Sequence, residues 1–281
     1  MSTFVRLGHG LHRPAEHLTT LADRCGAYLD ALPEGTVISG ITAARLHGLW
    51  VPEAAETERL EFATARAETA GSTLARCRRN EIHPRRRALR PDEIDVTDRF
   101  ALTSVARTWV DLAEFLSVED LVAAGDSALR GDATVAELTD ATTRAHRRRG
   151  VLRAREALQL LDGRSRSRPE SHLRCIVVRA GLPYPRVNQA IYTANGEWLA
   201  EPDLSYPRAR VALEYNGKDH ADLERMRKDI TREIDIDGNE WKVVVFGARE
   251  VFKTPYQIPP YLRGILDRRD PGWSRRPPDP R

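Results

Sequence analysis

The sequence predicts an α/β protein with a mainly helical N-terminal region and a C-terminal domain in which helices flank a mixed β-sheet. Apolar residues recur at helical spacing through most of residues 18–161. From residue 167 onward, a helix-type pattern precedes three short strand-type segments, a second helix-type pattern and the buried strand-type run WKVVVF at 241–246. Such an order is typical of helices packed on a sheet.

The chain of 281 residues has the length of one large domain or two modest ones. We expect a mainly helical DNA-binding or regulatory region at 1–162, an α/β domain at 163–270 and a disordered, proline-rich tail at 271–281. Two short predicted helices before residue 50 permit a helix-turn-helix. Any small helical subdomain has the same pattern.

Individual elements of the N-terminal region follow from periodicity and capping residues. Ser117 and Asp120 form a capping-box pattern that opens one of the helices. Short strands are predicted at 58–65 and 81–84. Helices are predicted at 18–32, 42–49, 101–116, 117–130, 135–147 and 151–161.

Composition excludes several classes of protein. Hydrophobic residues make up 41% and charged residues 30% of the chain, which favours a packed core over disorder. No apolar run approaches the roughly 18 residues of a membrane span, and the first residues lack the apolar core of a signal peptide. Three widely spaced cysteines argue against a disulfide framework and a zinc site. We therefore expect a cytoplasmic protein with reduced thiols and no membrane partner.

Basic residues are unevenly distributed, although the net charge is only +3. Arginines cluster at 76–90 and at 144–168. Because guanidinium groups suit phosphate contacts, DNA is the expected partner. A solvated arginine-rich surface is the alternative. Six residues of these clusters are predicted DNA contacts: Arg85, Arg86, Arg87, Arg147, Arg148 and Arg149.

Two carboxyl side chains of the predicted sheet are candidate metal ligands. Segments 188–193 and 197–206 are expected to form a hairpin around an Asn-Gly turn, and 210–216 a third strand. If the next turn centres on 207–208, Asp203 pairs with Ala212 and faces the same way as Glu214. Asn216 then shares that face, and the alternate residues of the third strand face the core.

Carboxylates on one sheet face suit metal-dependent phosphodiester cleavage. Mg²⁺, or Mn²⁺, prefers oxygen ligands and keeps several waters when one or two carboxylates hold it. The ion activates a water and neutralises charge in the transition state. We predict Asp203 and Glu214 as metal ligands, Asn216 as an auxiliary ligand, and Lys218 or His220 as a base or phosphate contact. The alternative is a local turn contact for Asp203 and an arginine partner for Glu214.

Glu170 is the third candidate carboxylate. It lies in a predicted helix at 169–180, with Ser167 as N-cap and Pro169 in the first turn. A Ser-x-x-Glu pattern is also a capping box, which is purely structural. The catalytic interpretation is a carboxylate that reaches the metal through water, and both roles can hold together.

Three segments resemble a bacterial family of uncharacterised domains related to very-short-patch-repair endonucleases: SRPESHLRCIVVRAGLPYPRVNQ, EPDLSYPRARVALEYNGKDH and RMRKDITREIDIDGNEWKVVVF. The resemblance implies a restriction-endonuclease-like fold and a metal-dependent DNA endonuclease. Motif positions of that family fall on Glu170, Asp203, Glu214, Gly217, His220, Arg225, Asp229 and Arg232. The resemblance thus adds Arg225 and Arg232 to the predicted DNA contacts, and a surface ion-pair ladder on a helix is the alternative for them.

One residue departs from the family pattern. Asn216 stands where the family usually has Asp, so the site has one negative charge fewer. Two functions therefore stay open. One is a Mg²⁺-dependent endonuclease, and the other is a non-catalytic DNA-binding regulator of antitoxin type with a decayed nuclease fold. A protein–protein scaffold would leave the arginine clusters without a partner.

The N-terminal region has a resemblance of its own. The segments VISGITAARLHGLWVP and FALTSVARTWVDLAEFLSVEDLVAAGDSALR resemble regions found upstream of such nuclease-like domains. They are also similar to the DNA-binding antitoxin of abortive-infection toxin–antitoxin systems. This resemblance implies a winged-helix-like module near 15–97 that binds DNA, together with a regulatory domain. A scaffold that merely supports the nuclease is the alternative.

Overall fold

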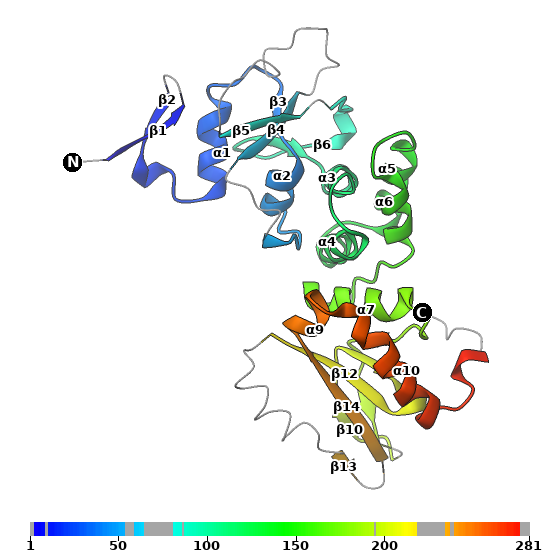
Figure 1. Cartoon of the computed structure of the whole chain (residues 1–281). Helices are drawn as coiled ribbons and strands as arrows, with labels where there is room; N and C mark the ends of the chain where they lie inside the picture. Colours follow the sequence, from blue (N-terminus) through cyan, green and yellow to red (C-terminus); the bar gives the residue numbers. More distant parts are fainter. Residues whose placement is uncertain are drawn as a thin grey trace. The chain divides into compact units, whose positions relative to one another are not determined.

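A computed structural model shows the chain as two compact units, residues 1–159 and 160–281. Helices and strands occur in both, so the predicted α/β class is confirmed (Figure 1). The structure describes residues 3–8, 11–53, 59–64, 81–85, 87–193, 195–217, 234–236 and 239–275. Among these residues, no helix has the length and apolar character needed to cross a membrane.

The first part of the N-terminal unit is built on a five-stranded sheet with the order β5-β4-β3-β7-β6. Its strands are β3 (Thr36–Ile38), β4 (Leu60–Thr64), β5 (Ile82–Arg85), β6 (Ile94–Val96) and β7 (Ala101–Thr103). Before the sheet come a separate hairpin, a short 3-10 helix and the first α-helix, namely β1 (Phe4–Gly8), β2 (Leu11–Pro14), η1 (Ala15–His17) and α1 (Leu21–Leu29). The helices α1 and α2 (Gly40–Leu46) pack on the sheet through a core that includes Tyr28, Ala43 and Phe62.

This sheet corrects three predictions. The N-terminal region is mixed helix and strand rather than mainly helical, and β3 separates α1 from α2, so no tight turn joins them as in a helix-turn-helix. Residues 101–103, expected in a helix, form β7 instead. Segments of three residues are too short to show a period, so pairing with neighbouring strands decides their conformation. The strands predicted at 58–65 and 81–84 are confirmed as β4 and β5.

Four helices complete the N-terminal unit, and a short 3-10 helix, η3 (Pro91–Glu93), precedes β6. The four are α3 (Val105–Leu112), α4 (Val118–Arg130), α5 (Val135–Arg144) and α6 (Val151–Leu158). Ser117 accepts a hydrogen bond from the Asp120 amide, which confirms the predicted cap of α4. Trp109 is fully buried among these helices, and its Nε1 donates to the Leu121 carbonyl at 2.8 Å.

The C-terminal unit contains a second five-stranded sheet with the order β13-β14-β12-β11-β8. Its strands are β8 (Arg186–Val187), β11 (Leu204–Tyr206), β12 (Val211–Asn216), β13 (Ile234–Ile236) and β14 (Asn239–Gly247). The β8–β11 and β11–β12 pairs are antiparallel, whereas β12 and β14 are parallel. The 3-10 helix η4 (Pro207–Ala209) joins β11 to β12.

The strand predicted at 188–193 is shorter, because only β9 (Ile191–Tyr192) falls within it, and the strand predicted at 197–206 is divided into β10 (Trp198–Ala200) and β11. Between β8 and β11, the strands β9 and β10 form a separate antiparallel hairpin. Asn188 directly follows β8 and has φ 46°, a left-handed conformation that ends the extended backbone before β9. Pro202, which has no amide hydrogen for a strand ladder, precedes β11.

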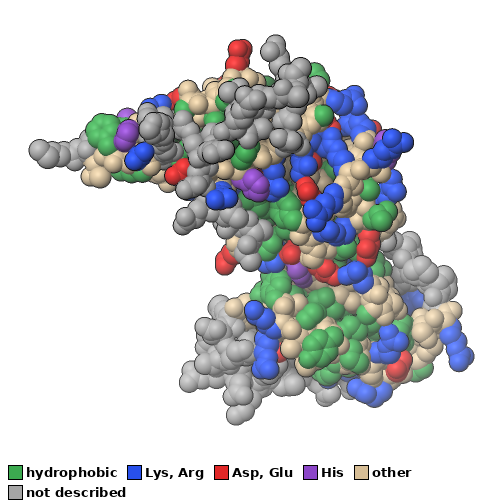
Figure 2. Space-filling model, turned by 45° about the horizontal axis from the view of Figure 1, so that its top comes forward, with side chains coloured by type: hydrophobic (Ala, Val, Ile, Leu, Met, Phe, Trp, Pro, Cys, Tyr) green, Lys and Arg blue, Asp and Glu red, His purple; other side chains and the backbone are tan. Residues whose placement is uncertain are grey.

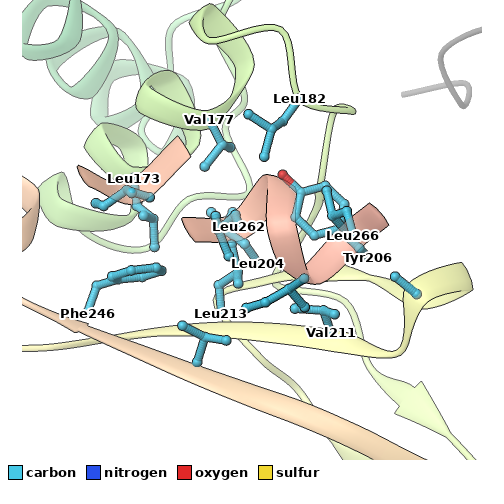
Figure 3. Packing of buried hydrophobic residues seen from close by; sticks show 14 of the residues in the cluster. Leu173, Val177, Leu182, Leu204, Tyr206, Val211, Leu213, Phe246, Leu262 and Leu266 are labelled. Atoms are coloured by element: carbon cyan, nitrogen blue, oxygen red, sulfur yellow. The ribbon is translucent and has the colours of Figure 1, made fainter. Parts of the chain in front are cut away.

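Helices cover one face of this sheet. These are α7 (Arg168–Arg179), α9 (Ala248–Phe252) and α10 (Ile258–Arg269), with the 3-10 helices η5 (Pro255–Gln257) and η6 (Trp273–Arg275). Figure 3 shows side chains of α7 and α10, among them Leu173 and Leu262, meeting Val211 and Leu213 of β12. The predicted core face of the third strand is therefore confirmed. Ile234, expected at the end of a helix that begins near residue 221, lies in β13, and residues 218–233 lie outside the described part.

Leu213→Ala should lower the free energy of unfolding by about 2–5 kcal/mol, because the side chain is fully buried at the centre of this core. Chemical denaturation followed by circular dichroism measures the change. Leu152→Ala is the matched control, because Leu152 is 74% exposed and its truncation should change stability by less than about 0.5 kcal/mol. Equal effects of the two substitutions would contradict the assigned core.

Candidate active site

Asp203 and Glu214 lie on neighbouring antiparallel strands of the C-terminal sheet. The paired residues are Tyr206 with Val211, Ser205 with Ala212, and Leu204 with Leu213. This register, continued by one residue, sets Asp203 opposite Glu214. Residues directly opposite in an antiparallel pair project from the same face, so both carboxyl groups lie on the face away from α7 and α10.

This register corrects the sequence-based one, which set Asp203 opposite Ala212. The difference arises because η4 and Arg210, which has a left-handed φ of 52°, make the connection four residues long. The register therefore moves by two residues. An even shift keeps each side chain on its face, and it brings the two carboxyl groups from a diagonal to a direct pair.

The two carboxyl groups interact directly. Each carboxyl group changes the pKa of the other, and Asp203 Oδ2 accepts a hydrogen bond from the Tyr215 amide at 2.8 Å. Burial, together with the negative charge of Asp203, raises the pKa of Glu214 to about 7. Burial also raises the pKa of Asp203, against the hydrogen bond from Tyr215. The pair therefore holds a proton readily when no cation is bound.

Glu170 lies near this pair but is held by other groups. It is 6% exposed, and its charge contributes to the raised pKa of both Asp203 and Glu214. Its Oε1 accepts a hydrogen bond from Ser167 Oγ at 2.7 Å, and its Oε2 accepts from the Arg166 amide at 2.8 Å and from Asn188 Nδ2 at 2.7 Å. The Ser167 hydroxyl also accepts a hydrogen bond from the Glu170 amide and so caps α7. Glu170 is therefore structural, although its carboxylate accepts from the Arg166 amide, whereas the expected capping box uses the amide of Ser167 itself.

Asn188 belongs to the site and was not among the predicted residues. Its backbone amide donates to the Asp203 carbonyl at 3.0 Å, and its side chain donates to Glu170 Oε2 and to the Arg164 carbonyl. The residue thus connects the start of α7 to the start of β11. The signal in the sequence was its residue type, because asparagine adopts the left-handed conformation found here more readily than most residues.

The remaining predicted residues of this site are only partly described. Asn216 is half-buried at the end of β12, on the same strand face as Glu214, and it pairs with Gly247 of β14. Lys218, His220, Arg225, Asp229 and Arg232 lie outside the described residues. Within the part of the chain that is described, no cluster of three or more His, Cys, Asp or Glu residues is arranged to hold a metal ion. The carboxyl pair with the Asn216 amide remains the candidate oxygen donor set.

Several arginines predicted to contact DNA form ion pairs within the N-terminal unit. Arg85 bonds Glu61 at 2.6 Å, Arg87 bonds Glu114, and Arg148 bonds Asp111 at 3.3 Å. Arg147 is exposed, and the Arg149 side chain is 80% exposed although it lies 4.0 Å from Glu114, while Arg86 lies outside the described residues. Figure 2 shows basic side chains gathered on the side of this unit where α5 and α6 lie.

Comparison with known proteins gives relatives without a described activity. The chain is 32% identical over 175 residues to two uncharacterised proteins of Mycobacterium tuberculosis, one from each of two strains. The alignment covers 62% of this chain and 64% of each relative. No family model matches the chain. No solved structure matches it.

The raised pKa of Glu214 predicts a pH-dependent stability. Because the folded pKa is about 7 and the ordinary value is 4.5, the folded state retains a proton that the unfolded state loses, and stability falls as pH rises from about 4.5 to about 7. Glu214→Gln lacks the titrating carboxyl group, so this loss of stability should not occur in the variant. With a discount for partial exposure, the free energy of unfolding of the variant minus that of the unsubstituted protein should increase by about 1–2 kcal/mol from about pH 5 to about pH 8.

Chemical denaturation in a chelating buffer at both pH values measures this effect. Glu197→Gln, at an exposed position of the β9–β10 hairpin, is the control and should follow the unsubstituted protein. A pH profile of Glu214→Gln that parallels the unsubstituted protein would show that the Glu214 carboxyl is not perturbed.

Proposed function

We propose that the C-terminal unit is a Mg²⁺- or Mn²⁺-dependent DNA endonuclease with a restriction-endonuclease-like fold. The observation that carries the proposal is the position of Asp203 opposite Glu214, one residue beyond the Leu204–Leu213 pair that ends the β11–β12 ladder. The sheet supports it, because a helix precedes two antiparallel strand pairs and a parallel fourth strand, which agrees with the family resemblance of the sequence.

The oxygen donors fit a hard divalent cation. Two carboxyl groups that repel one another at close range are stabilised when a cation binds between them, and magnesium needs only one or two carboxylates in addition to water. A bound ion supplies an activated water and neutralises the charge of the pentavalent phosphate. In this proposal Asp203 and Glu214 hold the ion, and the Tyr215 amide fixes the orientation of Asp203.

Asp203→Asn and Glu214→Gln should each abolish nicking of a supercoiled plasmid in the presence of Mg²⁺ or Mn²⁺, because each removes a charged ligand while keeping the shape of the side chain. The activity of the unsubstituted protein should disappear with a chelator. Glu197→Gln removes an acid of the β9–β10 hairpin and should leave nicking intact. Nicking that persists in Asp203→Asn and Glu214→Gln would overturn the proposed active site.

A second function, a DNA-binding regulator with a decayed nuclease site, is favoured by Asn216. An amide in place of the family's carboxylate weakens the attraction for a divalent ion. The same nicking assay on Asn216→Asp separates the two functions. The regulator is favoured if the unsubstituted protein neither nicks DNA nor is stabilised by Mg²⁺ while Asn216→Asp gains both properties.

DNA binding by the N-terminal unit should depend mainly on its exposed arginines. The double substitution Arg147→Ala, Arg149→Ala should flatten the slope of log affinity against log salt by roughly 2, because each lost phosphate contact contributes about 0.9. Fluorescence anisotropy with a labelled duplex between about 50 and 200 mM salt measures the slope. Arg85→Ala should change it little, since Arg85 is paired with Glu61. A larger effect of Arg85→Ala than of the double substitution would show that Arg85, and not Arg147 and Arg149, contacts DNA.

A further inference from the structure

Arg166 is a cation that the structure holds beside the carboxyl pair. Its backbone amide donates to Glu170 Oε2 at 2.8 Å, and its guanidinium forms an ion pair with Glu201. Glu201 precedes Asp203 by two residues, with Pro202 between them. Arg166 is therefore connected to the site at two points, through its backbone to Glu170 and through its side chain to the segment that carries Asp203.

The ion pair is exposed enough to exchange partners. The side chains of Arg166 and Glu201 are 53% and 35% exposed. Exposed ion pairs contribute little to stability, so an incoming anion of suitable shape can replace one member at small cost. A phosphate matches the planar guanidinium through two parallel hydrogen bonds, as a carboxylate does.

Electrostatics agree with this placement. The pKa of Asp203 is raised mainly by burial and by Glu170, whereas the charge of Arg166 acts in the opposite direction and lowers it. Arg166 is thus near enough to Asp203 for their charges to interact. An anionic substrate that approaches three acidic groups needs such a cation, because the carboxylates alone would repel it.

We propose that Arg166 binds a backbone phosphate of the nucleic acid at the Asp203–Glu214 site, and that Glu201 holds the guanidinium in place until the phosphate replaces it. The proposal rests on the proposed function for the identity of the ligand. It adds a phosphate-binding residue and an exchangeable acidic partner to the site. The binding of DNA without cleavage tests it separately from the nuclease activity.

Two substitutions with opposite expected effects make the test. Arg166→Gln should weaken the binding of a labelled DNA duplex in chelating buffer and flatten its salt slope by about 0.9, the contribution of one phosphate contact. Glu201→Gln should tighten binding about twofold to fivefold, because the competing carboxylate is gone. When Glu201→Gln is combined with Arg166→Gln, the tighter binding should disappear, because the guanidinium that Glu201 would release is absent.

Matched controls remove the same charges elsewhere in the C-terminal unit. Arg208→Gln replaces an exposed arginine of η4, at the opposite end of the β11–β12 ladder, and Glu197→Gln replaces an exposed acid of the β9–β10 hairpin. Thermal melts establish that every variant is folded. Equal changes in Arg166→Gln and Arg208→Gln, no tightening in Glu201→Gln, or the absence of DNA binding by the unsubstituted protein would each overturn the proposal.

Failure of this inference and failure of the nuclease proposal give different results. If the protein does not nick DNA but the binding pattern of the Arg166 and Glu201 variants is found, the phosphate site stands and the catalytic function fails. If the protein nicks DNA and Arg166→Gln binds DNA like the unsubstituted protein, the nuclease stands and Arg166 is a structural ion-pair partner.

Discussion

Two carboxyl groups that face one another across neighbouring strands impose the main constraint on the C-terminal unit. Asp203 and Glu214 are partly buried, and their repulsion opposes folding whenever both are ionised. The opposite face of the same strands supplies the compensating stability, because Val211 and Leu213 are fully buried against α7 and α10. Sheet pleating thus separates the stabilising apolar face from the face that carries the two carboxyl groups within six residues of β12.

Fixed positions for these carboxyl groups require support from outside their own strands. Glu170 provides part of it, because it accepts hydrogen bonds from the Arg166 amide and from Asn188. Asn188 then donates to the carbonyl of Asp203, so the first turn of α7 and the start of β11 are tied together. Glu170 therefore helps, through Asn188, to hold Asp203 at the start of β11. It can thus be structural at the start of α7 and still affect the site.

Sequence periodicity predicted which face of the sheet carries Asp203 and Glu214, but not the turns that set the register around them. Alternation of apolar residues in β12 predicted which side chains enter the core, because a pleated strand has a period of two. The same reasoning missed the four-residue connection after Tyr206 and the left-handed Asn188, which depend on local turn chemistry. In the N-terminal unit it missed β3 and β7, because three-residue strands are defined by their neighbours.

The environment of each arginine, more than the number of arginines in a segment, decides whether its charge is available to a polyanion. Arg107 is 2% exposed and bonds Glu93 at 2.7 Å and Asp111 at 3.0 Å, while Asp111 also accepts a bond from Arg148. A buried guanidinium must keep such partners, since an unpaired buried charge costs several kcal/mol, on the order of 3–5. The charge of Arg107 thus stabilises the fold of this unit. Any attraction of the unit for a polyanion depends on its exposed arginines, which in the described residues include Arg147 and Arg149.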